Sequence, residues 1–265
     1  MKIRAIAQNT FSTLVRDKLL IVFAVIFLCV LLLMIGSLTV MKTAAATDPS
    51  VLQSTELPLI GGIMSLVSGL GSLLAVWASA DSLWSELKSG TILAVMARPV
   101  RRWEFLLGKF LGVQWLMAIY VLFLLVMSYL LAWIGGARIQ STPWVLIVYP
   151  MVRYAIYSAF SLLLATVLHP VVTLGIVVVN AVVTDMVGPD GNARFLPDWL
   201  RSAVYAALPS TGLLSESRFL TITEAKLKQI PWTEHAIALA YGLDCALVFL
   251  LLAMWAFRRR GLVRN

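Results

Sequence analysis

The sequence predicts an all-α protein that crosses a lipid bilayer six times. Three observations predict this fold class: a very apolar composition, six apolar runs long enough to span a membrane, and basic residues at the edges of those runs. The 265 residues are 60% hydrophobic and 13% charged, and the mean hydropathy is +0.91. Soluble domains are roughly half apolar and one quarter charged, so a single soluble core could not bury this much apolar surface.

The charge balance fits the same class. The net charge is +8, and a basic chain can indicate nucleic-acid binding. Here, however, the Lys and Arg residues lie at the ends of apolar runs, which is the pattern of the positive-inside rule. We therefore expect no nucleic-acid partner. Cys29 and Cys245 lie inside apolar runs, so they indicate neither a disulfide framework nor a metal site.

The N-terminal segment, residues 1–18, places four basic side chains among apolar residues at helical spacing. This pattern predicts an amphipathic helix that lies in the membrane interface; a frayed basic tail is the alternative. The apolar run that follows is longer than that of a signal peptide and lacks a small-residue cleavage site. We therefore expect the first span to remain in the mature protein.

About 20 apolar residues are needed to cross the hydrocarbon layer. The first expected span, residues 19–41, carries no charge, and the second, residues 57–80, is rich in Gly and Ser. Small residues let helix backbones approach closely inside a membrane, so the second span should face other helices. The remaining four spans are expected at residues 110–134, 143–168, 171–188 and 235–257.

The connections between the spans predict their orientation. The N-terminal segment, the loop 81–109 and the C-terminal tail are basic and lie on one side if there are six spans. The positive-inside rule places that side, with both termini, in the cytoplasm. The segment 189–234 then lies outside, where we expect short surface helices. A seventh span is disfavoured because Asp198 and Arg201 would lie in hydrocarbon.

The loop 81–109 is the most charged connection before the fifth span. Pro99 should end a short helix there, because the residue before a proline is pushed out of helical geometry. A second, amphipathic piece should turn Trp103, Leu106 and Leu107 toward lipid or protein. Its basic residues, Arg101, Arg102 and Lys109, should face headgroups. An interfacial linker between two spans, without a partner, is the alternative.

An ordered set of residues in this loop matches a known pattern: Glu86, Gly90-Thr91, Arg98-Pro99-Val100, Arg102, Glu104 and Leu107-Gly108-Lys109. The loop thereby resembles the type 2 permeases of ATP-binding cassette (ABC) transporters. More specifically, it is similar to the branch that includes the permease of nitrous-oxide-reductase copper-site maturation. The match is sharp in the loop, and the six-span topology extends it loosely over the rest of the chain.

The resemblance implies a single permease domain over residues 1–265, an exporter-type transport subunit of a bacterial inner membrane, and no enzymatic activity of its own. Its implied partners are an ABC ATPase subunit on the cytoplasmic side, a second copy of the chain in a homodimer, and an accessory extracytoplasmic protein. Residues 84–97 would form the coupling helix that docks on the ATPase. The side chains implied in coupling are Trp84, Glu86, Lys88, Gly90, Thr91, Arg98 and Arg102.

The chain contains no Gly-x-x-x-x-Gly-Lys-Ser/Thr sequence, the signature of a phosphate-binding loop. We therefore expect ATP and Mg to be bound by the partner ATPase, and neither a cofactor nor a metal in this chain.

Three ionisable residues lie within the expected spans. Arg153 and Asp244 each lie about ten residues from the outer side, which at about 1.5 Å per residue is roughly 15 Å deep. An ion pair between them is geometrically feasible, and Asp185 in the fifth span is a competing partner. Charged groups at this depth are usually paired or functional. They either line a substrate path or fix the helix register.

Two other classes of function have less support in the sequence. A proton-coupled secondary transporter that uses the intramembrane Asp and Arg residues should have inverted repeats, but spans one to three do not resemble spans four to six. An intramembrane protease would need a His-Glu-x-x-His or Gly-x-Gly-Asp motif, and neither occurs. His169 reads as a turn residue and His235 as an interfacial one.

Overall fold

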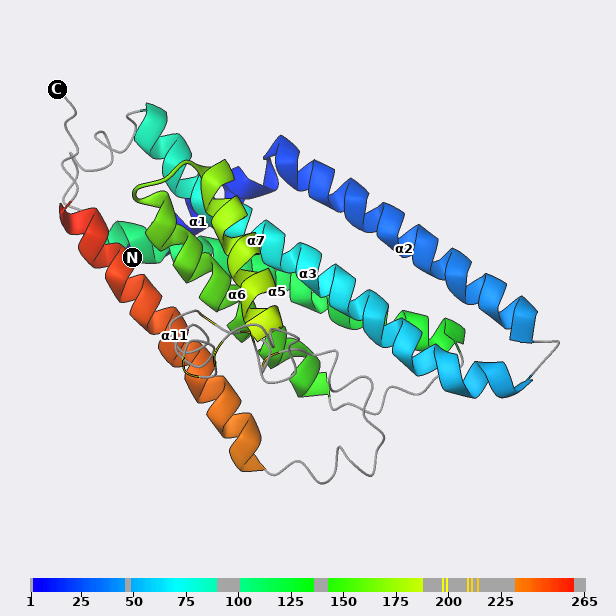
Figure 1. Ribbon diagram of the computed structural model, residues 1–265. Helices are drawn as coiled ribbons and strands as arrows, with labels where there is room; N and C mark the ends of the chain where they lie inside the picture. Colours follow the sequence, from blue (N-terminus) through cyan, green and yellow to red (C-terminus); the bar gives the residue numbers. More distant parts are fainter. Residues whose placement is uncertain are drawn as a thin grey trace.

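The computed structural model describes residues 2–45, 49–89, 101–135, 143–187 and 232–259, together with a few single positions between the last two ranges. Within this part of the chain no strand occurs, and seven helices account for the regular structure (Figure 1). They are α1 (Lys2–Val15), α2 (Lys18–Ala45), α3 (Pro49–Ser89), α5 (Arg102–Gly135), α6 (Pro143–Ala165), α7 (Pro170–Val187) and α11 (Trp232–Arg259).

Four stretches in these helices are long and apolar enough to cross a membrane: Leu66–Ser89, Arg102–Met127, Trp144–Ala165 and Trp232–Arg259. The all-α, multi-span class is therefore confirmed. Helices α2 and α7 coincide with the first and fifth expected spans. The apolar segments found in them among the described residues, Leu20–Val30 and Pro170–Thr184, are shorter. The expectation that the chain crosses the membrane six times therefore stays a prediction.

Helices α3, α5 and α6 form the centre of the bundle (Figure 1). Helix α11 packs along α6, α1 packs on α5, and α2 lies outside the centre along α3. One apolar core joins the three central helices and includes Leu74, Ala78, Val113, Met117 and Tyr154. A second core adds the end of α11 and includes Leu83, Phe105, Leu106, Leu162, Ala253 and Phe257.

Glycines allow the closest helix crossings. A Cβ atom at Gly71 of α3 would lie 2.3 Å from the Tyr120 ring of α5. Gly108 and Gly112, one helical turn apart on α5, face α1, and a Cβ at Gly112 would lie 2.7 Å from the Ala7 carbonyl oxygen. A side chain at either position would push α1 away from α5. The N-terminal segment is therefore a packed helix, and the frayed tail is excluded.

The central helices extend beyond the expected spans. Helix α3 continues through residues 81–89, which we had expected to begin the loop, and α5 begins at Arg102 rather than at residue 110. No Gly or Pro interrupts residues 72–89. The Ser82 and Ser85 hydroxyls donate to backbone carbonyls within the same helix. At the start of α5, the Arg101 N–H donates to Glu104 Oε2 at 2.8 Å, as in a helix cap.

Candidate functional site

The described parts of the three basic segments share one end of the bundle, which we call the basic end (Figure 1). It comprises α1, residues 81–89 of α3, Arg101 with residues 102–109 of α5, and residues 255–259 of α11. Contacts between elements far apart in the sequence define it: α1 against Gly108, Glu86 against Lys109, and Arg102 against the last turn of α11. Most of the residues singled out in the loop therefore gather at this end.

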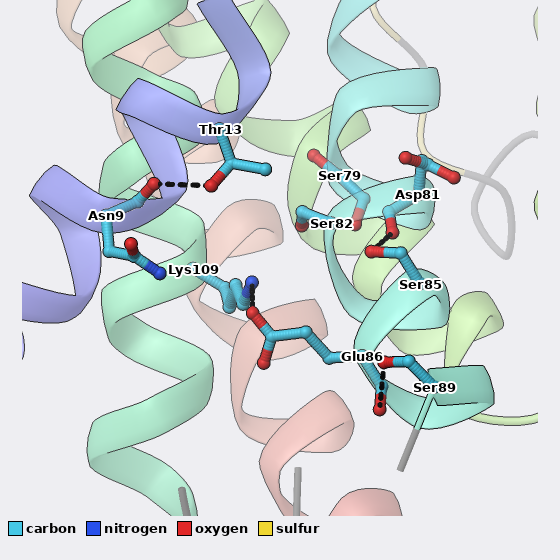
Figure 2. Close-up of polar contacts among 9 residues, drawn as sticks. All are labelled: Asn9, Thr13, Ser79, Asp81, Ser82, Ser85, Glu86, Ser89 and Lys109. Carbon is cyan, nitrogen blue, oxygen red and sulfur yellow. Dashed lines mark hydrogen bonds and ion pairs between the residues drawn. The ribbon is translucent and has the colours of Figure 1, made fainter. Parts of the chain in front are cut away.

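An ion pair joins α3 to α5 at the basic end. Figure 2 shows the Lys109 side chain reaching from α5 to Glu86 of α3, where its Nζ donates to Oε1. The Lys109 side chain is 5% exposed and the Glu86 side chain 20%. Nζ also lies 5.6 Å from the centre of the Phe105 ring. Because both side chains are largely buried, removing either Lys109 or Glu86 would leave the other charge buried without a partner.

This geometry corrects our expectation that Lys109 faces lipid headgroups: its side chain is buried between helices. It also changes the role that Glu86 is expected to have. One oxygen of the carboxylate binds Lys109, and the other is buried without a hydrogen bond among the described residues. Glu86 therefore points into the protein and holds α3 to α5, whereas a direct contact with a partner would require it to face outward.

Asp81 and Trp84 connect the same stretch of α3 to other elements. The half-buried Asp81 carboxylate lies within electrostatic range of the acidic Asp17, which repels it, and of Lys109 and His169, which attract it. The Trp84 ring packs edge-on against the His169 ring, with centroids 5.2 Å apart. The Val171 N–H in turn donates to His169 Nδ1 at 3.3 Å. His169 is thus the structural turn residue that we expected, and it links α3 to the beginning of α7.

Arg102 ties the beginning of α5 to the end of α11. Its Nη1 donates to the carbonyl oxygens of Phe257, at 3.3 Å, and Arg258, at 2.9 Å. Directly beneath, the rings of Phe105 and Phe257 stack with centroids 6.0 Å apart. Carbonyls in the last turn of a helix lack partners within the helix. Arg102 therefore caps α11 instead of facing away from the bundle.

The remaining residues implied in coupling divide into two groups. Lys88 lies in the last turn of α3, and its side chain is exposed. Gly90, Thr91 and Arg98 lie outside the described residues. Of the described coupling residues, Lys88 is the exposed one, since Trp84, Glu86 and Arg102 have contacts inside the chain.

The structure does not pair Arg153 with Asp244. Arg153 is buried in α6, with its guanidinium carbon 5.6 Å from the Tyr154 ring centre. Asp244 is exposed on α11, and the side chain of Asp185 is outside the described part. Around Arg153, α6 makes polar contacts with two neighbouring helices. Gln114 Nε2 donates to Ser158 Oγ at 2.6 Å, and Ser161 Oγ donates to the Val76 carbonyl oxygen.

The opposite end of the bundle is aromatic. Trp144 of α6 and Trp232 of α11 stack with centroids 5.4 Å apart, and the Tyr149 hydroxyl lies 2.7 Å from His235 Nδ1. Trp and Tyr are enriched where a membrane meets water. From His235 to the arginines that end α11 is about 35 Å along the helix, a little more than the thickness of a hydrocarbon core.

Sequence reasoning missed the glycine pair and the buried lysine. Gly108 and Gly112 stand four residues apart, a spacing of small residues that marks close helix contacts in membranes. The sequence also places Glu86 shortly after the second expected span and Lys109 directly before the third, so the two could have been proposed as an ion pair. The capping role of Arg102 left no sequence signal, since its partners are backbone atoms 155 and 156 residues away.

Comparison with known proteins adds one finding. A family model described as ABC-2 family transporter protein matches residues 4–262, nearly the whole chain. No curated protein matches the chain.

Proposed function

The chain belongs to the ABC-2 family of transporter proteins, and from this premise we propose that it is the permease subunit of an ABC exporter-type transporter. Membership makes it a membrane component of an ABC transporter, and such a component works with an ABC ATPase. The finer proposal is a homodimer in a bacterial inner membrane. Each copy has six spans and both termini in the cytoplasm, and the partner ATPase binds ATP and Mg.

The observation that carries this proposal is the continuity of α3. The helix runs without interruption from its apolar stretch to Ser89 at the basic end. There the Lys109–Glu86 pair joins it to α5. A force applied beyond Ser89 would therefore displace two spanning helices together, as a packed element moves when a domain beside it closes.

Within this proposal the coupling residues have two roles. Lys88 and, beyond the described residues, Gly90, Thr91 and Arg98 contact the ATPase. Glu86 and Arg102 transmit the movement inside the chain, because their side chains hold α3 to α5 and α5 to α11. Trp84 extends the connection to the turn before α7.

Co-purification of the full chain with its co-expressed ABC ATPase subunit tests the proposal. Lys88→Glu reverses an exposed charge at the basic end and should reduce the recovered ATPase at least fivefold. Glu234→Lys is the matched control, because it changes the charge by the same magnitude at the exposed, opposite end of α11. Equal recovery with both variants and the wild type would refute docking at Lys88.

A proton-coupled secondary transporter is the alternative, and the exposed Asp244 carboxylate in the middle of α11 favours it. The chain reconstituted alone in vesicles distinguishes the two. Flux driven by a proton gradient without ATPase and ATP would support the alternative, and flux that requires both would support the ABC transporter.

We also propose, from the resemblance of the loop, that the chain is related to the copper-site maturation branch and works with an extracytoplasmic accessory protein. Retention of a periplasmic protein by the purified homodimer would test the second point.

A further inference from the structure

We propose that the basic end carries a binding site for an anionic phospholipid where α5 begins and α11 ends. We call this region the arginine corner, and it consists of residues 101–105 and 255–259. Arg102 and the stacked rings of Phe105 and Phe257 hold its two parts together. The proposal requires only that the chain lie in a membrane, and it is independent of the ATPase.

The charge of the arginine corner is strongly positive. Its ten residues include four arginines and one glutamate. The side chains of Arg101, Arg258 and Arg259 are exposed. The glutamate, Glu104, is partly buried and accepts a hydrogen bond from the Arg101 N–H. The exposed charge is therefore basic and lacks an exposed acidic side chain within the corner to neutralise it.

The helix ends do not oppose an anion here. The C-terminal end of a helix carries partial negative charge on its free carbonyls, which would repel a phosphate at the end of α11. Arg102 donates to two of these carbonyls, those of Phe257 and Arg258. The beginning of α5, which carries partial positive charge, lies beside them. The arginines of α11 can thus meet an anion with less of this penalty, because two of the free carbonyls are already bound.

One of the exposed arginines is held in place. The guanidinium carbon of Arg259 lies 3.9 Å from the centre of the Trp255 ring, close enough for a cation–π contact. The ring itself is 54% exposed. Because the stacking restrains the long side chain, less conformational entropy is lost when the guanidinium binds a phosphate.

An apolar strip leads from the corner along α11 and distinguishes a phospholipid from other anions. Val248, Leu251, Leu252 and Trp255 are all exposed large side chains. A soluble phosphate or an acidic protein segment would use the arginines and leave this strip uncovered. A phospholipid fits both parts, with its phosphate on the arginines and its acyl chains along α11.

Lipid titration of the full-length chain in neutral detergent tests the site. The probes are phosphatidylglycerol, phosphatidylcholine and soluble glycerol phosphate, and the readout is the number of lipids retained in native mass spectrometry. We expect the wild type to retain phosphatidylglycerol at lower concentration than phosphatidylcholine. Since one basic residue near an anionic surface contributes about fivefold in affinity, Arg258→Gln with Arg259→Gln should raise the half-saturating concentration roughly 30-fold.

The matched control is Arg16→Gln with Lys18→Gln, which removes the same charge from exposed positions at the junction of α1 and α2. It should change the half-saturating concentration less than threefold. Arg259→Lys keeps the charge, weakens the stacking on Trp255, and should give an intermediate value. Equal retention of both lipids, an equal loss in the control, or saturation by glycerol phosphate at the same concentration would overturn the proposal. All variants should unfold at the wild-type temperature, because the substituted side chains are exposed.

Discussion

The Lys109–Glu86 pair is the residue-scale feature on which the basic end depends. Both charges are largely removed from water, and each is compensated by the other. Such a pair contributes modestly compared with an apolar replacement, but losing one partner is costly. The pair therefore positions α3 against α5 more than it adds net stability.

Replacing Lys109 with Met tests this interpretation. The variant keeps the length of the side chain but leaves the Glu86 carboxylate without its partner, so we expect a loss of about 3 kcal/mol. Thermal unfolding of the detergent-solubilised chain measures it. The double variant Lys109→Met with Glu86→Leu should recover most of the loss, since no charge is then buried. No recovery would show that packing alone determines the effect.

The positions of these residues were predictable, but the directions of their side chains were not. The loop pattern identified Trp84, Glu86 and Arg102, and all three lie at the basic end. It did not indicate that they contact His169, Lys109 and the end of α11. Those contacts join residues between 23 and 156 positions apart, and only the packed bundle brings them together.

At the scale of elements, the crossing of α1 and α5 depends on two glycines. Their missing side chains let the α1 backbone lie directly on α5, next to the ion pair. Helix α1 buries Ala7, Thr10 and Leu14 and exposes the basic Arg4, and Arg16 directly after the helix is exposed as well. This division follows the amphipathic pattern that predicted the helix.

Gly112→Ala should displace α1. The added Cβ would lie 2.7 Å from both the Ala7 carbonyl oxygen and Thr10 Cβ, so the helices must separate, at a cost of about 1–3 kcal/mol. Limited proteolysis should then cleave within α1 at least several-fold faster. Gly175→Ala is the control, because nothing lies within 4 Å of the added atom. Equal cleavage of both variants would contradict the close crossing.

Helix existence was predictable from apolar runs, whereas helix ends were not. A run such as 57–80 reports where side chains suit lipid. Helix α3 continues past it because residues 81–89 contain no Gly or Pro and include the helix formers Leu83, Glu86, Leu87 and Lys88. Leu83 is fully buried against its neighbours, so packing also favours the extra turns. Hydropathy measures the surroundings of a helix, while capping and packing determine its length.

At the scale of the whole molecule, the basic and aromatic ends predict an orientation. Cysteine labelling in a background of Cys29→Ala and Cys245→Ala tests it. Ser85→Cys and Glu234→Cys place exposed thiols at the basic and aromatic ends, respectively. An impermeant maleimide should label position 234 in intact cells or spheroplasts and position 85 only after permeabilisation. The reverse result would place the basic end outside and exclude coupling to a cytoplasmic ATPase there.

The whole-molecule arrangement was only partly readable from the sequence. Charge bias predicted that the basic segments share a side, and they share one end of the bundle. The ion pair that equal depth would allow between Arg153 and Asp244 does not form, since depth specifies position along a helix and not the direction that a residue faces. Asp244 lies on the uncovered face of α11, while Arg153 points into the bundle.

Helix α11 is fastened near both of its ends, by Arg102 at one and by the Tyr149–His235 and Trp144–Trp232 contacts at the other. Between them, Gly242 lets it touch Val152 and Leu214 closely. We therefore expect helices α6 and α11 to move as one rigid body during a transport cycle. Spin labels placed on these two helices should report the same separation with and without ATP. Any rearrangement would then be carried by helices such as α2, which lies at the edge of the bundle against α3 and α5.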